Sequence, residues 1–286
     1  MALQLLPYLL LVVAFVLLWL PPLRRLWPLL FTASVGSALW QEQITATTLS
    51  AITLFALLCW SWRKWLRSGH RLLRLGGWLL LLCGSLALAL HLVPGFVALP
   101  VMPEVTLSSA SPPFSIRYHY NKAVVGFLLL ALCAPLLTQR RDWVVMLQRV
   151  WPIWLVTFTA VAAVMMAAGY LRIDLKLHEA FIGWALGNLF FTCMAEEAFF
   201  RLLIQTPLQQ RLGSQPMMVA VTIGLTTLLF GLVHLAAGWP MVFAATLAGI
   251  GYSWAYYKTG RIEAAILVHF GVNAAHFLLM TYPLAR

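Results

Sequence analysis

Two adjacent glutamates lie inside a long apolar stretch of the chain. The run Phe181–Leu203 contains Glu196 and Glu197, and Arg201 follows within the same run. An ionised carboxylate inside a membrane costs roughly 2.5–3.5 kcal/mol on insertion scales, so such groups persist where they face a protein interior or a water-filled cavity. Since the chain has only 8 Asp and Glu among 286 residues, two acids side by side at membrane depth indicate the part that performs chemistry.

Helical spacing predicts different roles for the two acids. Glu197 and Arg201 are four residues apart, so they lie one turn apart on one face of a helix and can pair. Glu196 is rotated by roughly 100° from Glu197, onto a face that also carries Thr192 and Asn188. We therefore expect Glu197 to be neutralised and structural. Glu196 is then available to hold a water molecule and to act as a general base.

Two later apolar stretches carry histidines at helical spacing. Phe230 precedes His234 by one turn, and His269, Asn273 and His276 follow the i, i+4, i+7 spacing of one helical stripe. A carboxylate, two imidazoles and an amide on separate helices are the groups that amide hydrolysis requires, with a base for water and donors for developing negative charge. A purely structural hydrogen-bonding role is the alternative interpretation.

The composition indicates the environment of these groups. The chain is 62% hydrophobic and 9% charged, with a mean hydropathy of +0.88. Soluble domains carry about 25% charged residues. The chain is therefore a polytopic membrane protein.

The apolar stretches predict an all-α, polytopic transmembrane helical bundle. A membrane span needs about 20 apolar residues, and two of the stretches are short, so we expect about eight to ten spans. The stretches are 2–20, 26–41, 44–62, 76–98, 123–138, 150–170, 181–203, 215–235, 240–257 and 264–282.

A segment rich in proline and serine divides the chain. Residues Val101–Lys122 contain Pro103, Pro112 and Pro113 among several serines and predict an irregular linker. We expect an N-terminal transmembrane region, residues 1–122, without an assigned role, and a C-terminal transmembrane region, residues 123–286. The chemistry-bearing residues predict a core of about residues 180–282 with four helices.

The net charge of +11 indicates membrane topology. Lys and Arg are concentrated in alternate loops, such as those around Arg63 and Arg140, and this excess marks the cytoplasmic side. Both termini and the Val101–Lys122 loop then face outward. We expect no nucleic-acid partner, since no recognition motif accompanies the basic residues. The bilayer is the expected environment, and short loops favour a bacterial inner membrane. The oligomeric state is not indicated.

Together, the three motifs resemble those of the CAAX-protease and bacteriocin-processing family of intramembrane proteases. That family includes the type II CAAX prenyl proteases and lysostaphin-resistance-like bacterial proteins. Its pattern of Glu-Glu-x-x-x-Arg, Phe-x-x-x-His and His-x-x-x-Asn occurs here in the same order between Glu196 and Asn273. The resemblance covers residues 180–282, under half the chain. It implies an intramembrane endopeptidase whose substrate is a membrane protein or peptide.

The resemblance also implies catalytic roles for four residues. Glu196 and His234 would polarise a water molecule that attacks a peptide carbonyl. His269 and Asn273 would donate hydrogen bonds to the oxyanion as it forms.

Three further motif residues would support the site. Glu197 and Arg201 would pair and fix their helix, and Phe230 would support His234. His276 lies outside the family pattern, and we expect it to be structural.

Metal use is a separate question, because a set of one glutamate and two histidines can hold zinc with an open position for water. The His-Glu-x-x-His zinc motif is absent from the sequence. Apart from Glu196 and Glu197, no carboxylate is evident as a partner for the histidines. We therefore expect a glutamate mechanism without a metal cofactor, with zinc as the alternative.

Two other classes of function remain open at this stage. The intramembrane ionisable groups could form the proton relay of a transporter or channel, although no inverted repeat is evident. A non-catalytic immunity or scaffold protein could also retain the fold for binding. The substrate itself is open among prenylated carboxyl-terminal tails, bacteriocin-like leader peptides and carboxyl-terminal sorting helices.

Overall fold

The computed structural model describes residues 2–285 and is all-α apart from one small sheet. Its principal elements are α1 Ala2–Leu17, α2 Trp27–Trp40, α3 Ala46–Arg67, α4 Arg71–Ala89, β1 Leu99–Thr106, β2 Pro113–Tyr118, α5 Tyr120–Leu132, α6 Arg140–Ala167, α7 Ala180–Leu186, α8 Met194–Glu197, α9 Thr206–Leu212, α10 Pro216–Leu232, α11 Trp239–Thr259 and α12 Ile262–Leu279.

Each predicted span coincides with helical backbone, although several boundaries move. The stretch 76–98 ends as a helix at Ala89, and the stretch 123–138 ends at Leu132. By length and composition, α4, α6 and α12 could cross a membrane, and shorter apolar helices occupy Leu3–Leu17, Tyr120–Leu132 and Pro216–Leu232. The total of eight to ten spans stays a prediction.

Contacts divide the chain into two compact units. The first unit contains Met1–Leu99, Tyr118–Thr138 and Phe190–Leu203, and the second contains Pro100–Arg117, Gln139–Leu189 and Ile204–Arg286. The units are thus assembled from interleaved segments. The sequence instead predicts two continuous regions that meet between residues 122 and 123, and this division stays a prediction.

In the first unit, α5 is the most deeply buried helix. Nearly all of its residues are buried, and it packs against the segment that carries the paired glutamates. Gly126 permits this approach, because a Cβ atom there would lie 2.6 Å from the Cα atom of Ala195. The side chain of Trp78 on α4 donates to the carbonyl of Leu203 at 2.7 Å, which anchors the other end of the same segment.

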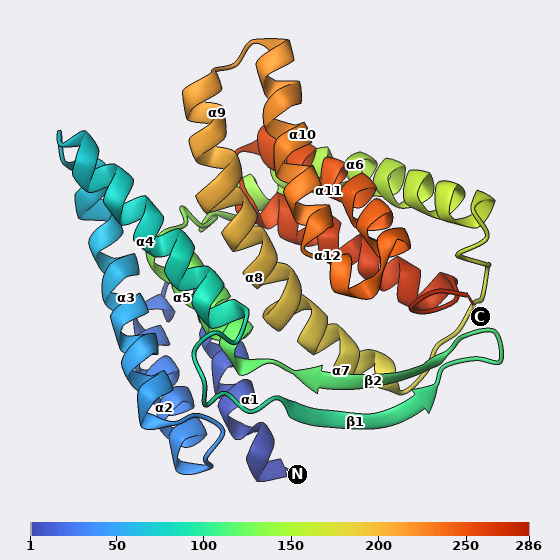
Figure 1. The fold of residues 1–286 in the computed structure, drawn as a ribbon, viewed down its shortest axis with the longest axis horizontal. Coiled ribbons are helices and arrows are strands. Elements are labelled where there is room, and N and C mark those ends of the chain that lie inside the picture. The colour runs from blue at the N-terminus through green and yellow to red at the C-terminus, as the bar shows by residue number, and fades with distance from the viewer. Residues whose placement is uncertain (1, 286) are drawn as a thin grey trace. The chain divides into compact units, whose positions relative to one another are not determined.

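In the second unit, α6, α10, α11 and α12 form a four-helix core. Helix α11 packs against the other three helices, and α12 also packs against α6. Figure 1 shows α10, α11 and α12 in orange to red and α6 in yellow-green. Small residues bring the backbones together, since a Cβ atom at Gly231 would lie 1.9 Å from the hydroxyl oxygen of Thr246. This core includes α6, which lies outside residues 180–282, so the four-helix core predicted for those residues stays a prediction.

The prediction of an irregular linker at Val101–Lys122 was wrong. Strands β1 and β2 pair there into a two-stranded sheet (Figure 1). The second strand carries Phe114, Ile116 and Tyr118 at alternate positions, the pattern of a half-buried strand, and Ile116 and Tyr118 are buried. The prolines and serines around it obscured this alternation.

The helix that carries the glutamates is not uniformly α-helical. Two π-helical segments, Gly187–Cys193 and Ala198–Gln205, flank the short α8, and α9 continues the helical backbone to Leu212. A π-helical turn closes hydrogen bonds from i to i+5 and frequently marks a functional site. The α-helical spacing used to align Asn188 and Thr192 with Glu196 therefore does not apply across the first π segment.

Candidate active site

The first unit contains a fully buried ion pair. The Nε atom of Arg201 lies 2.6 Å from Oε2 of Glu197, and both side chains have an exposed fraction of 0%. The predicted pairing across one turn is present, even though the intervening backbone is π-helical. Removing one partner of such a pair would leave an uncompensated charge in an apolar interior. The pair therefore holds this part of the helix in a single arrangement.

Glu196 is in a different position from its neighbour. Its side chain is half-buried, and its Oε2 atom is buried without a hydrogen-bond partner among the residues that the structure describes. Buried polar atoms are almost always hydrogen-bonded, and an exception calls for a functional or solvent explanation. A carboxylate oxygen that is withheld from internal partners can accept a hydrogen bond from a water molecule.

In the second unit, Phe230 contacts two imidazole rings. Its ring centroid lies 5.1 Å from that of His234 and 5.6 Å from that of His269, the latter with the rings nearly perpendicular. Phe230 is itself 2% exposed. The structure thus brings His234 and His269 onto one aromatic side chain, although they are 35 positions apart in the sequence.

A backbone contact fixes the tautomer of His234. Helix α10 ends at Leu232, and His234 lies just beyond it, with Nδ1 2.9 Å from the carbonyl oxygen of Phe230. A carbonyl oxygen only accepts hydrogen bonds, so Nδ1 of His234 must be the donor. In the neutral ring, Nε2 then carries no proton and can accept one from water.

His269 on α12 is held between two aromatic rings. It is 4% exposed and stacks on Tyr252 of α11 with a centroid separation of 4.4 Å and an interplanar angle of 14°. Phe230 packs against it from α10. Sequence reasoning missed Tyr252, because the chain alone offers no signal that pairs this residue with His269 on the next helix.

Asn273 and Asn188 form the second contact that the sequence did not reveal. Nδ2 of Asn273 donates to Oδ1 of Asn188 at 3.2 Å, which links α12 to the π-helical segment. This bond orients the Asn273 amide. His276 has a different environment, because its Nε2 atom lies 3.1 Å from the carbonyl oxygen of Thr281 and its ring packs against Tyr282. These contacts agree with the structural role expected for His276.

The side chains predicted for the site therefore form two groups. Glu196, Glu197 and Arg201 belong to the first unit, and Phe230, His234, His269 and Asn273 belong to the second. In the described part of the chain, no three His, Cys, Asp or Glu side chains are arranged to hold a metal ion.

Comparison with known proteins identifies the region that contains both groups. No curated protein and no solved structure matches the chain. Residues 178–275, about a third of the chain, match the family model described as type II CAAX prenyl endopeptidase Rce1-like. The match includes every predicted catalytic residue from Glu196 to Asn273 and ends just before His276. The chain is therefore an integral membrane protein that carries an Rce1-like domain, the domain of CAAX-type intramembrane endopeptidases, which act on membrane-associated proteins.

Proposed function

We propose that this intramembrane endopeptidase hydrolyses its substrate with a water molecule activated by Glu196 and His234. The observation that carries the proposal is that the two adjacent glutamates differ in their partners. Glu197 is neutralised by Arg201 at 2.6 Å, whereas a buried oxygen of Glu196 has no hydrogen-bond partner in the described chain. Of these two glutamates, Glu196 is therefore the one available for proton transfer.

In the first step, the Glu196 carboxylate and Nε2 of His234 polarise the attacking water. Both groups accept hydrogen bonds from it, because the Nδ1 proton of His234 is directed to the Phe230 carbonyl. As the water oxygen attacks the substrate carbonyl carbon, one water proton passes to Glu196. A general base at this position contributes typically 10²–10⁴-fold to the rate.

In the second step, the tetrahedral intermediate places negative charge on the former carbonyl oxygen. An N–H group of His269 and an N–H group of Asn273 stabilise this oxyanion. Donors that are already oriented in a dry site are the effective ones. Stacking on Tyr252 and the bond to Asn188 supply that orientation.

Collapse of the intermediate breaks the carbon–nitrogen bond. Protonated Glu196 returns its proton to the leaving amine, so the carboxylate is regenerated and the products are a carboxylic acid and an amine. Glu197 and Arg201 do not exchange protons in this scheme, and they fix the helix that carries Glu196. We place this activity in a bacterial inner membrane.

Matched substitutions of the two acids test the assignment. Glu196→Gln should lower kcat for a membrane-peptide substrate by about 10²–10⁴-fold and leave the thermal unfolding temperature unchanged. Glu197→Gln should instead lower the unfolding temperature, because it leaves Arg201 buried without its counter-charge. Equal activity in Glu196→Gln and the unmodified protein would contradict the mechanism. The uncleaved peptides that accumulate in membranes of cells carrying Glu196→Gln would identify the substrate.

A further inference from the structure

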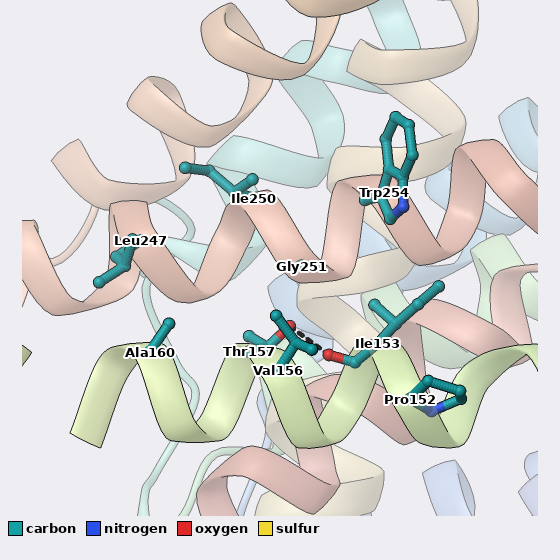
Figure 2. Close-up of a pocket in the computed structure, with 9 residues that line it drawn as sticks. All are labelled: Pro152, Ile153, Val156, Thr157, Ala160, Leu247, Ile250, Gly251 and Trp254. Atoms are coloured by element: carbon teal, nitrogen blue, oxygen red, sulfur yellow. Dashed lines mark hydrogen bonds between the residues drawn. The ribbon is translucent and has the colours of Figure 1, made fainter. Parts of the chain in front are cut away.

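An open apolar groove of about 550 Å³ lies between α6 and α11, and none of its lining residues belongs to the proposed catalytic set. Figure 2 shows Ile153, Val156 and Ala160 on the α6 wall and Leu247 and Ile250 on the α11 wall. The volume falls within the range of about 300–1,000 Å³ that ligand sites occupy. The groove is therefore large enough for a ligand.

The floor of the groove is a close helix crossing. A Cβ atom at Gly251 would lie 1.9 Å from the hydroxyl oxygen of Thr157, so only glycine allows this approach. The Thr157 hydroxyl donates to the carbonyl of Ile153 at 2.6 Å, the dashed line in Figure 2. Because the donor of this hydroxyl is already used and the walls are hydrocarbon, the groove suits an apolar chain.

One end of the groove is basic. Trp254 and Ile153 lie at the same end in Figure 2, and Nζ of Lys258 lies 4.9 Å from the centroid of the Trp254 ring. On α6, the exposed Arg149 precedes Ile153 by four residues, so it lies one turn beyond the groove on the same helical face. At this end of the groove, each helix therefore carries a cationic side chain one turn beyond the lining residues, Arg149 on α6 and Lys258 on α11.

We propose that this groove binds an acyl chain of an anionic phospholipid, with the headgroup phosphate at Lys258 and Arg149. Ile153 and Ala160 are seven residues apart, so they span about 10 Å of helix, which accommodates the first part of an acyl chain. The topology predicted from the sequence puts Lys258 and Arg149 on the cytoplasmic side, where anionic lipids are attracted to basic side chains. The site is separate from the proposed peptidase mechanism.

A substitution that fills the groove tests the apolar part. The full-length protein is reconstituted in bilayers of phosphatidylglycerol and phosphatidylethanolamine, and the lipids retained after detergent extraction are measured by native mass spectrometry. Ala160→Phe should reduce retained phosphatidylglycerol at least fivefold. Ala163→Phe, the same change at an exposed position of α6 outside the groove, should leave it unchanged.

A second pair of variants tests the basic end. Lys258→Gln should lower the preference for phosphatidylglycerol over phosphatidylethanolamine about fivefold, the effect of one basic side chain near an anionic lipid surface. Lys64→Gln is the control, because Lys64 lies over Trp60 at 4.4 Å in the same arrangement but does not line this groove. An equal effect of the two lysine variants would overturn the headgroup assignment.

Two further results would overturn the proposal as a whole. One is equal lipid retention by Ala160→Phe and Ala163→Phe. The other is a raised KM for the peptide substrate in Ala160→Phe with lipid retention unchanged, which would make the groove a substrate-docking surface. If Ala160→Phe does not fold, a phospholipid with a photoreactive acyl chain should label α6 and α11 peptides of the unmodified protein. Absence of that labelling also overturns the proposal.

Discussion

The two groups of site residues are stabilised in opposite ways. The group in the first unit consists of charged side chains, and Glu197 and Arg201 neutralise each other within one turn of the same helix. The group in the second unit consists of neutral rings and an amide, and its contacts join different helices, as between His269 and Tyr252.

The difference follows from the cost of placing each kind of group in an apolar interior. A buried charge needs an opposite charge in excellent geometry, and a neighbour on the same helix supplies it without dependence on the rest of the fold. A neutral imidazole needs only packing and one or two hydrogen bonds, so helices remote in sequence can provide them. The ion pair should therefore govern stability, whereas the neutral group should act in catalysis together with Glu196.

The largest effect should come from breaking the ion pair. Arg201→Met should destabilise the protein by about 3–5 kcal/mol, because it removes the opposite charge that the buried Glu197 carboxylate faces at 2.6 Å. The double variant Glu197→Leu/Arg201→Met should recover most of this loss, since no charge is then stranded. Unfolding in detergent with increasing denaturant measures both. If the double variant is no more stable than the single one, neutralisation is not the function of the pair.

The next effect should fall on catalysis alone. Asn273→Ala should lower kcat by about 10²–10³-fold, the usual cost of removing one oxyanion donor, with KM and the unfolding temperature unchanged. Asn188→Ala should produce a smaller decrease, because Asn188 orients the Asn273 amide without touching the substrate. Steady-state kinetics on both variants distinguish these roles, and an equal decrease in both would contradict them.

Another ion pair, between Asp174 and Lys176 outside the predicted spans, provides an intermediate case. Asp174 lies 3.0 Å from Lys176 and also accepts hydrogen bonds from Ser108 and Ser111. Burial raises the pKa of Asp174. The hydrogen bonds from Ser108 and Lys176 and the charge of Lys176 outweigh burial, so the pKa is lowered from its ordinary value of 3.8.

The direction of this shift determines its effect on stability. A folded-state pKa below the unfolded value means that Asp174 stabilises the fold fully above about pH 4. That contribution decreases as the pH falls from 3.8 through the lower folded-state pKa. The unfolding temperature of the unmodified protein should therefore decrease more steeply with acid than that of Asp174→Asn. Parallel curves would show that the pair contributes nothing.

The smallest expected effect is that of a chelator. We propose that the mechanism needs no metal, so protein treated with 1,10-phenanthroline and then freed of it should retain its activity on a membrane peptide. The Glu196→Gln variant, assayed in parallel, gives the activity expected when catalysis is lost. Activity that disappears on treatment and returns with added zinc would replace the glutamate mechanism with a zinc mechanism.

The sequence by itself determined the features that depend on neighbouring residues. Apolar runs predicted every helix that carries a site residue, because hydrocarbon requires each backbone polar group to be bonded within its own segment. The four-residue spacing of Glu197 and Arg201 predicted their pairing for the same local reason. The order of the three motifs was sufficient to indicate the family.

The tertiary structure alone decided the contacts between remote segments. Tyr252 stacks on His269, Asn188 orients Asn273, and strands β1 and β2 pair within a segment rich in proline. Periodicity describes which face of one helix a residue occupies, but it contains no information about which other helix packs there. The close approaches at small residues, of Gly126 to Ala195 and of Gly251 to Thr157, likewise join remote segments and are a property of the folded chain.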